Sequence, residues 1–320
     1  MDARIIRRKL DLVNGLAIVD SRPVTGWRAR TARHLGPGEY EDIDPWHAVS
    51  EPAGWPAQQT VFLEAAAEVP PDWDPGRTFF AFSFRDLEGL LSIDGRPWAG
   101  LDFAHSRVPV PGPGRHGLQV EFQSVPQAFW EPGARSNQGL FQGARLVLVD
   151  ADVEGAYYDL RFAFETANVV HDERRRALLA AAVEDAMLAI DLALQPDASR
   201  REVKAARGRL AERLAAIGRD PEGGRLLLTG HTHIDTAWLW PLKETVRKCS
   251  RTFATACRLM ERYPEYHFAC SQAQLYAYTK RHYPGLFADI RRWVAAGRWE
   301  NTGAMWVEPD ANLISGESMV

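Results

Sequence analysis

The stretch Gly230-His231-Thr232-His233-Ile234-Asp235-Thr236-Ala237-Trp238-Leu239-Trp240 decides how the C-terminal part of this chain folds. The apolar run at residues 225–229 precedes it and is too short for a helix, so it predicts a buried parallel strand. Residues 242–263 follow and predict a helix. The stretch therefore lies where a strand ends and a helix is about to begin, which is where α/β folds bind ligands.

Three polar side chains alternate along this strand end. His231, His233 and Asp235 are expected on one side, because successive side chains of an extended strand face opposite ways. Two imidazoles and a carboxylate suit a divalent metal such as zinc. The alternative is a hydrogen-bonded His–Asp pair that only orders the strand end, since a lone His-x-His often arises by chance.

Toward the C-terminus, the pattern strand–helix–strand–helix–strand predicts repeated βα units of a parallel sheet or barrel. Strands are expected at 226–229, 266–270 and 299–307, and helices at 242–263 and 274–296, the latter with a break at a proline. The carboxyl ends of parallel strands meet at one face, so the polar residues after each strand are expected to gather there. After the second and third strands these are Ser271, Gln272, Glu308, Asp310 and Asn312.

Toward the N-terminus, residues 51–168 are expected to form a β-sandwich of the jelly-roll kind, because short strand-like runs alternate with turns. Its last predicted strand is the aromatic run at 157–164. Residues 1–50 are expected to wrap this domain, with a strand pair at 10–20 around the hairpin signal Asn14-Gly15.

A helical hairpin is expected at 169–222, with Ser199 capping its second helix, and it would connect the sandwich to an incomplete (β/α) barrel at 223–320. Within the sandwich, Asp102 and His105 predict a hydrogen-bonded loop pair, with ligand contact as the alternative. The predicted fold class is thus a multidomain β plus α/β protein.

Length and composition narrow the range of functions. The chain has 320 residues, which favours two or three domains, and its net charge of −4 without a basic face argues against nucleic acid as a partner. No run of about 18 apolar residues predicts a membrane span. Three cysteines without a disulfide framework, and an N-terminus without a signal peptide, predict a cytoplasmic protein.

Four blocks follow one another in the C-terminal third: LTGHTHIDTAWLWP at 228–241, FACSQAQLY at 268–276, GRWE at 297–300 and GAMWVEPDANL at 303–313, the last followed by SGES at 315–318. In this order and spacing they resemble the metal and nucleophile blocks of glycoside hydrolase family 38, the α-mannosidases. Residues 51–217 resemble the N-terminal region of the cytosolic and bacterial branch of that family.

The resemblance implies a zinc-dependent glycosidase acting on terminal α-linked mannose in glycans or oligosaccharides. His233 and Asp235 would ligate one zinc ion, and Asp310 would be both a zinc ligand and the catalytic nucleophile. Such an enzyme retains configuration, because the carboxylate attacks the anomeric carbon and water then hydrolyses the glycosyl-enzyme. Relatives of this branch also suggest a homo-oligomer. The other implied site residues are Trp238 and Asn312 at the sugar, and His231 and Gln272 beside the zinc ligands.

Retaining hydrolysis needs a second carboxyl group roughly 5 Å from the nucleophile. The resemblance implies that this acid, with a further zinc-binding histidine, follows the nucleophile block, so the chain is expected to be an N-terminal portion that is inactive alone. Glu308 is a formal candidate for the acid, although the resemblance does not assign it that role. Two alternatives stay open: a zinc-dependent hydrolase similar to polysaccharide deacetylases, and a non-catalytic glycan-binding fragment.

Overall fold

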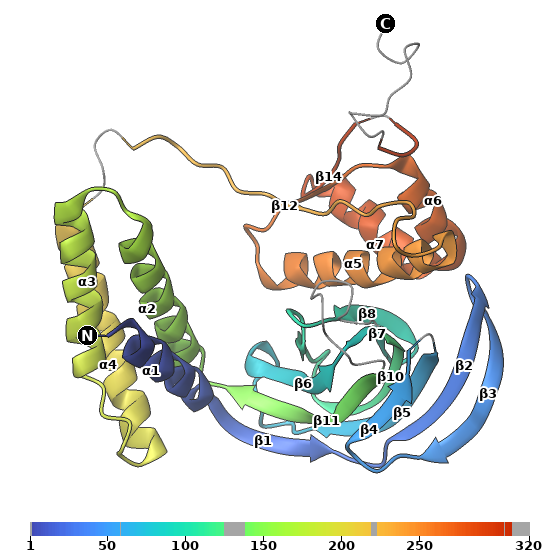
Figure 1. Ribbon diagram of the computed structural model, residues 1–320, viewed down its shortest axis with the longest axis horizontal. Coiled ribbons are helices and arrows are strands. Elements are labelled where there is room, and N and C mark those ends of the chain that lie inside the picture. Colours follow the sequence, from blue (N-terminus) through green and yellow to red (C-terminus); the bar gives the residue numbers. More distant parts are fainter. Residues whose placement is uncertain (1, 58, 125–137, 219–222, 304, 309–320) are drawn as a thin grey trace, which may run out of the picture. The chain divides into compact units, whose positions relative to one another are not determined.

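The structure is a computed structural model that describes residues 2–57, 59–124, 138–218, 223–303 and 305–308. It divides into two compact units, each assembled from separate stretches of chain (Figure 1). The helical unit comprises Met1–Arg22, Asp72–Phe79 and Leu146–Leu226, and the sheet unit comprises Pro23–Pro71, Phe80–Arg145 and Leu227–Val320. Across the described ranges, no helix combines the length and the apolar character that a membrane span requires.

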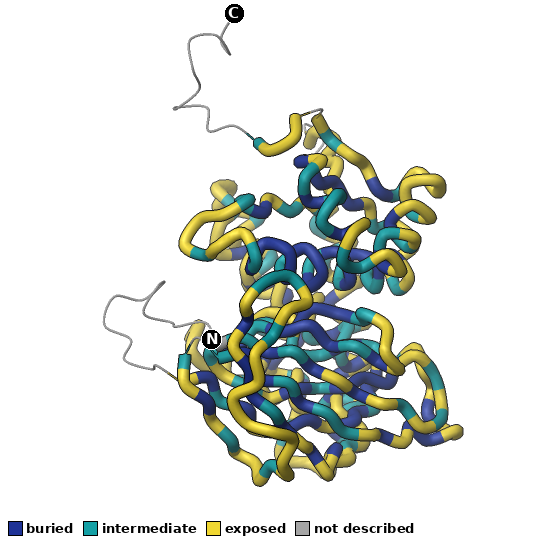
Figure 2. The backbone as a smooth tube through the Cα atoms, turned by 90° about the vertical axis from the view of Figure 1, so that its right-hand side faces the viewer, coloured by how far each residue is buried: buried dark blue, intermediate teal, exposed yellow. Residues whose placement is uncertain are grey.

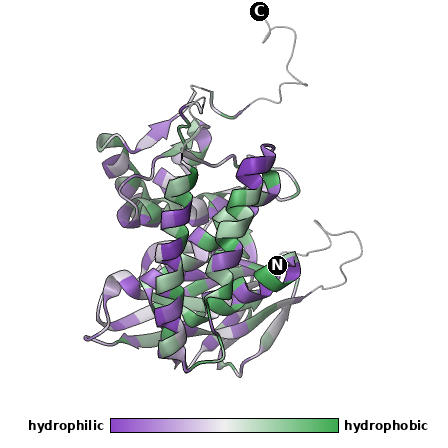
Figure 3. Cartoon of the chain, turned by 90° about the vertical axis from the view of Figure 1, so that its left-hand side faces the viewer, coloured by the Kyte–Doolittle hydropathy of each residue, from purple (hydrophilic) through white to green (hydrophobic). Residues whose placement is uncertain are grey.

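Four helices pack together in the helical unit: α1 (Ala3–Leu16), α2 (Ala151–Val169), α3 (Glu173–Leu188) and α4 (Pro196–Ile217). Figure 3 shows hydrophilic and hydrophobic residues interspersed along the helices. The predicted helical hairpin is present as α3 and α4. Ser199 is not its cap, because α4 already begins at Pro196 and the Ser199 hydroxyl donates to the Asp191 carbonyl at 2.9 Å.

The strand predicted at 157–164 is wrong, because these residues lie inside α2. The Asp150 carboxylate caps this helix by accepting from the backbone N–H of Asp152 at 3.1 Å and Val153 at 3.3 Å. The aromatic residues that favoured a strand include Tyr158 and Phe162, which lie on its exposed side. The buried side recurs every three or four residues, as a helix demands: Val153, Ala156, Leu160, Ala163, Phe164 and Ala167.

The strand pair predicted at 10–20 is also wrong over its first half, which belongs to α1. Ile6, Leu10 and Val13 are buried at helical spacing, and Asp2 caps the helix by accepting from the Arg4 N–H at 2.7 Å. The Asn14-Gly15 pair therefore forms the last turn of α1 and not a hairpin. A strand begins only at Ile18.

The strands in the N-terminal half of the chain form two sheets, the larger of which is antiparallel throughout. The larger has the order β3 (Glu39–Ala48), β2 (Arg28–Gly36), β5 (Thr60–Val69), β10 (Gly114–Ser124), β7 (Leu87–Ile93) and β8 (Arg96–Leu101). The smaller has the order β1 (Ile18–Val24), β11 (Gln138–Val149), β6 (Thr78–Arg85) and β9 (Arg107–Pro109), with β4 (Ala53–Pro56) paired to β11. The short 3-10 helix η1 (Pro75–Arg77) precedes β6.

Aromatic side chains join the two sheets. Phe122 of the larger sheet and Phe141 of the smaller sheet are both fully buried, with ring centroids 6.3 Å apart. Trp27 packs edge-on against Phe141 at 5.2 Å, and its indole N–H donates to the Val24 carbonyl at 3.0 Å. The predicted β-sandwich is confirmed in outline, while its jelly-roll topology stays a prediction.

The C-terminal part of the sheet unit contains parallel βα units. Strands β12 (Gly230–His231), β13 (Phe268–Cys270) and β14 (Trp299–Asn301) pair in parallel in that order. Helix α5 (Leu242–Arg262) connects the first two strands, and α6 (Ala273–His282) and α7 (Pro284–Ala295) connect the last two. The predicted break at Pro284 is confirmed, and closure into a barrel stays a prediction.

The first of these strands is displaced from its predicted place. The run at 225–229 has no strand structure, and Leu226, Leu227 and Leu228 are about four-fifths exposed (79%, 77% and 83%). Pairing starts only at Gly230, whose N–H donates to the His267 carbonyl at 2.8 Å. A short apolar run does not make a strand unless a neighbouring strand satisfies its backbone. The third strand is likewise shorter than predicted, ending at Asn301.

Helix α5 lies between the larger antiparallel sheet and the parallel strands (Figures 1 and 2). Phe253 and Cys257 on α5 belong to one buried cluster with Leu90 of β7 and Phe268 of β13. Charged residues of α5 are buried as well. The Glu244 carboxylate accepts from Arg247 at 2.7 Å and from Arg251 at 2.6 Å, and these guanidiniums reach Glu121 and Glu88 on the sheet at 3.1 and 3.2 Å.

Replacing Glu244 by glutamine is predicted to lower the free energy of unfolding by roughly 3–5 kcal/mol at neutral pH, because two buried guanidiniums lose their shared countercharge. Burial alone would raise the pKa of Glu244, but Arg251 and Arg247 outweigh it and hold the pKa below its usual value. Its stabilising effect is therefore complete above about pH 4.5 and is lost as the pH falls through the lowered pKa.

Urea denaturation of both proteins at pH 7 and below pH 4 measures this effect. The control is Glu64→Gln, which removes an exposed ion pair with Arg28 at 2.8 Å and should cost at most about 1 kcal/mol. Equal losses in the two variants, or a Glu244→Gln deficit that does not shrink in acid, would contradict the prediction.

Candidate active site

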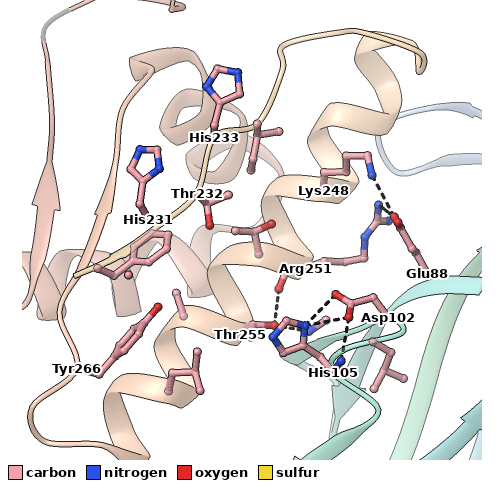
Figure 4. Close-up of a pocket in the computed structure, with 18 of the residues that line it drawn as sticks. Glu88, Asp102, His105, His231, Thr232, His233, Lys248, Arg251, Thr255 and Tyr266 are labelled. Atoms are coloured by element: carbon pink, nitrogen blue, oxygen red, sulfur yellow. Dashed lines mark hydrogen bonds and ion pairs between the residues drawn. The ribbon is translucent and has the colours of Figure 1, made fainter. Parts of the chain in front are cut away.

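The two residues predicted to bind metal meet directly after β12. The Nε2 atom of His233 lies 3.1 Å from Oδ1 of Asp235, and both side chains are nearly half exposed. Figure 4 shows the imidazoles of His231 and His233 on the same side of the strand, as the alternation of side chains predicts. Within the described residues His231 makes no hydrogen bond to His233 or Asp235, so its proposed role beside them rests on its position alone.

Glu308 also reaches His233, so these two strand-end residues meet at one face as expected, although this particular pair was not predicted. Its carboxylate pairs with His233 Nδ1 and accepts from the Ser271 hydroxyl. Both ring nitrogens of His233 therefore face carboxylates. Burial alone would lower the pKa of His233, but the hydrogen bond to Asp235 and the charge of Glu308 outweigh it and raise the pKa.

Gln272 holds the backbone on both sides of Asp235. Its side-chain amide donates to the Ile234 carbonyl at 2.8 Å and accepts from the Thr236 hydroxyl at 2.8 Å. The residue is buried and has a φ of +67°, a conformation that side chains other than glycine seldom adopt. Gln272 thus fixes the loop that carries Asp235, at the cost of local backbone strain.

The indole rings of Trp238 and Trp240 stand at right angles to each other. Trp238 and Trp240 have ring centroids 5.6 Å apart at an interplanar angle of 88°, and Trp238 is about half exposed. Trp240 is fixed by a hydrogen bond to the Thr245 hydroxyl at 3.1 Å and by the Lys248 ammonium 4.5 Å above its ring. An exposed indole beside the His233–Asp235 pair provides an apolar surface on which a sugar ring can stack.

The cysteine near this site is not a nucleophile. Cys270 ends β13 and is fully buried, and burial raises the pKa of its thiol to about 12. Cys249 and Cys257 are also buried free thiols with raised pKa values. Chemistry at this strand edge therefore depends on the carboxylates and histidines.

The side chains gathered here supply only part of a binding site for a metal such as zinc. His233 and Asp235 supply one imidazole and one carboxylate at hydrogen-bonding distance, which are ligand types that zinc accepts. Among the residues that the structure describes, no group of three potential ligands is assembled. The predicted third ligand and nucleophile, Asp310, and the predicted sugar contact, Asn312, lie outside the described residues.

Replacing Gln272 by alanine is predicted to lower the free energy of unfolding of the sheet unit by about 1–3 kcal/mol, because the Ile234 carbonyl and the Thr236 hydroxyl lose their partner. Intrinsic tryptophan fluorescence during urea denaturation measures this loss. The matched control is Gln274→Ala, two residues along the chain, whose described hydrogen bond is made by its backbone N–H. The interpretation is wrong if the two variants lose the same stability.

Comparison with known proteins shows which family this sequence resembles. Residues 224–320 match the model of the glycosyl hydrolases family 38 N-terminal domain. The chain is 39% identical over 283 residues to alpha-mannosidase 2C1 of Homo sapiens, covering 83% of this chain and 26% of that protein. It is 38% identical over 177 residues to alpha-mannosidase 2C1 of Mus musculus, covering 55% and 17%, and 46% identical over 96 residues to alpha-mannosidase G of Dictyostelium discoideum, covering 30% and 9%.

These matches favour neither the deacetylase-like hydrolase nor the glycan-binding fragment. The chain spans about a quarter or less of the length of the relatives it matches. The matched domain includes the His233–Asp235 pair, Gln272 and Glu308, and the similarity to the human relative extends far beyond that domain. The chain is therefore identified as a member of glycosyl hydrolase family 38, whose N-terminal domain its residues 224–320 match.

Proposed function

We propose that the protein to which this chain belongs hydrolyses terminal α-linked mannose with retention of configuration, at a zinc site formed by His233, Asp235 and Asp310. The observation that carries this proposal is the 3.1 Å contact between His233 and Asp235 at the carboxyl end of a parallel strand. This contact lies inside the segment that matches family 38, and imidazole and carboxylate are ligand types that zinc accepts.

Each neighbouring residue has a distinct part in this proposal. Gln272 positions the loop of Asp235 through Ile234 and Thr236, and His231 stands beside the ligands. Trp238 binds the apolar face of the mannose ring, with Asn312 as a further sugar contact. A zinc ion bound by these residues would supply a Lewis acid for the sugar hydroxyls.

Asp310 is the proposed nucleophile. Its carboxylate would attack the anomeric carbon as the glycosidic bond breaks, and the leaving oxygen would take a proton from a general acid; water would then release mannose from the ester. Glu308 is not proposed as that acid, because its carboxylate already contacts His233 Nδ1 and the Ser271 hydroxyl. Its proposed role is to orient His233 for metal binding.

The substrates proposed for this site are mannose-containing glycans or oligosaccharides. A cytoplasmic location is proposed from the three buried free thiols, which are typical of a reducing compartment. A homo-oligomer is proposed from the resemblance to the cytosolic and bacterial branch.

Activity and metal content of the protein expressed from its whole reading frame test this function. Asp310→Ala is expected to lower kcat for an aryl α-mannoside by about 10⁴-fold or more, because the covalent route is lost. His233→Ala is expected to abolish stoichiometric zinc, measured by elemental analysis. His267→Ala is the matched control, because its exposed imidazole hydrogen-bonds to the Glu265 carbonyl and alanine keeps the backbone carbonyl that accepts from Gly230. This variant should keep both zinc and activity.

The first mannose anomer released, followed by NMR, reports the stereochemical course and should be α. Release of acetate from acetylated glycans without release of mannose would instead support a deacetylase. Glycan binding without turnover by the whole protein would support a binding module. Full activity of Asp310→Ala would overturn the nucleophile assignment.

A further inference from the structure

A cavity of about 460 Å³ lies within the sheet unit, next to the candidate active site. Two segments more than 100 residues apart form it: the loop after β8, with Asp102 and His105, and the strand end that carries His231, Thr232 and His233 (Figure 4). Helix α5 and Tyr266 complete its walls. His233 and Trp240 line this cavity and also belong to the proposed catalytic site, so the two spaces adjoin.

A close approach between β8 and α5 fixes the sandwich side of the cavity. The Gly100 N–H donates to the Thr255 hydroxyl at 2.9 Å, and that hydroxyl donates to the Arg251 carbonyl at 2.9 Å. A Cβ atom at Gly100 would lie 2.9 Å from the Arg251 carbonyl oxygen, so only glycine allows this spacing. The loop that follows is thereby held against the helix.

The loop itself is ordered by Asp102. Its carboxylate accepts from the backbone N–H of Ala104 and of His105 at 2.8 Å, and from Nδ1 of His105 at 2.9 Å. The hydrogen bond that His105 donates to Asp102 raises the pKa of His105 despite its partial burial. With Nδ1 engaged, Nε2 of His105 is left without a protein partner among the described residues.

The charges that line the cavity are balanced. Lys248 and Arg251 both pair with Glu88, at 3.0 and 3.2 Å, and His105 pairs with Asp102. A charged ligand would therefore find no uncompensated partner, whereas a neutral ligand would not disturb these pairs. The Tyr266 hydroxyl is a second polar group that has no described hydrogen-bond partner, and its ring adds an apolar surface.

We propose that this cavity binds the neutral sugar unit on the leaving-group side of the scissile bond, with His105 Nε2 and the Tyr266 hydroxyl as its hydrogen-bonding groups. Polar groups on an apolar wall suit a sugar, which presents hydroxyls at its edge and C–H groups on its faces. The position beside His233 and Trp240 suits a unit linked to the mannose at the zinc site. This inference rests on the proposed function.

In the protein expressed from its whole reading frame, two substrates distinguish binding at the mannose site from binding at the leaving-group side. α-Mannosyl fluoride carries only the mannose, whereas an α-linked mannobiose, in whichever linkage is turned over fastest, also fills the leaving-group side. His105→Ala and Tyr266→Phe are each expected to lower kcat/KM for the mannobiose about 3- to 10-fold more than for the fluoride, as the loss of one hydrogen bond predicts. Tyr266→Phe keeps the ring, so it remains informative if His105→Ala folds poorly.

The matched control is His116→Ala. This histidine pairs with Asp94 at 2.7 Å, in the same manner as His105 with Asp102, but it does not line the cavity. Its substitution should leave the ratio of the two kcat/KM values unchanged. A wild-type protein that turns over neither substrate would overturn the proposed function. A wild-type protein active on both, with a ratio that neither His105→Ala nor Tyr266→Phe changes, would overturn the sugar subsite alone.

Discussion

The buried ion pairs of Glu244 with Arg247 and Arg251 are the contacts on which the sheet unit depends. They let a helix with charged residues on its buried side lie between an antiparallel sheet and a set of parallel strands. A purely apolar helix could fill the same space but would not fix its rotation against Glu121 and Glu88. Because α5 also follows the His233–Asp235 loop, this fixed position helps to set where these two residues lie in the sheet unit.

The sequence predicted the βα units and the sandwich because their patterns are local: alternation in β10, helical length before Pro284, and turns between strands. It failed where composition and periodicity disagreed. In residues 157–164 the aromatic content outweighed a buried pattern of period 3.6, and the cap at Asp150 was overlooked. Leu226, Leu227 and Leu228 were predicted to be buried because they are apolar, but they are exposed. Burial in a strand depends on a neighbouring strand, which a local sequence pattern does not specify.

The residues of the candidate site also fall into those that sequence patterns predict and those that they do not. His233 and Asp235 were predictable because two residues along a strand end face the same side by backbone geometry alone. The convergence of the strand ends that brings Glu308 to His233 was expected from the parallel βα pattern, but the specific pair was not. The positive φ of Gln272 has no sequence signature in a residue that is not glycine. A glutamine directly after a strand and before a helix was the one available signal, and its two hydrogen bonds explain why a strained conformation persists there.

The cavity beside His233 is built from both the sandwich and the parallel strands. Gly100 sets the distance between β8 and α5, and Asp102 turns the following loop so that His105 faces the strand end. A domain model that begins at residue 224 contains none of these three residues. Part of what the proposed site recognises would thus be determined by a loop more than 100 residues before His233 and Asp235, because the close contact at Gly100 fixes the position of that loop.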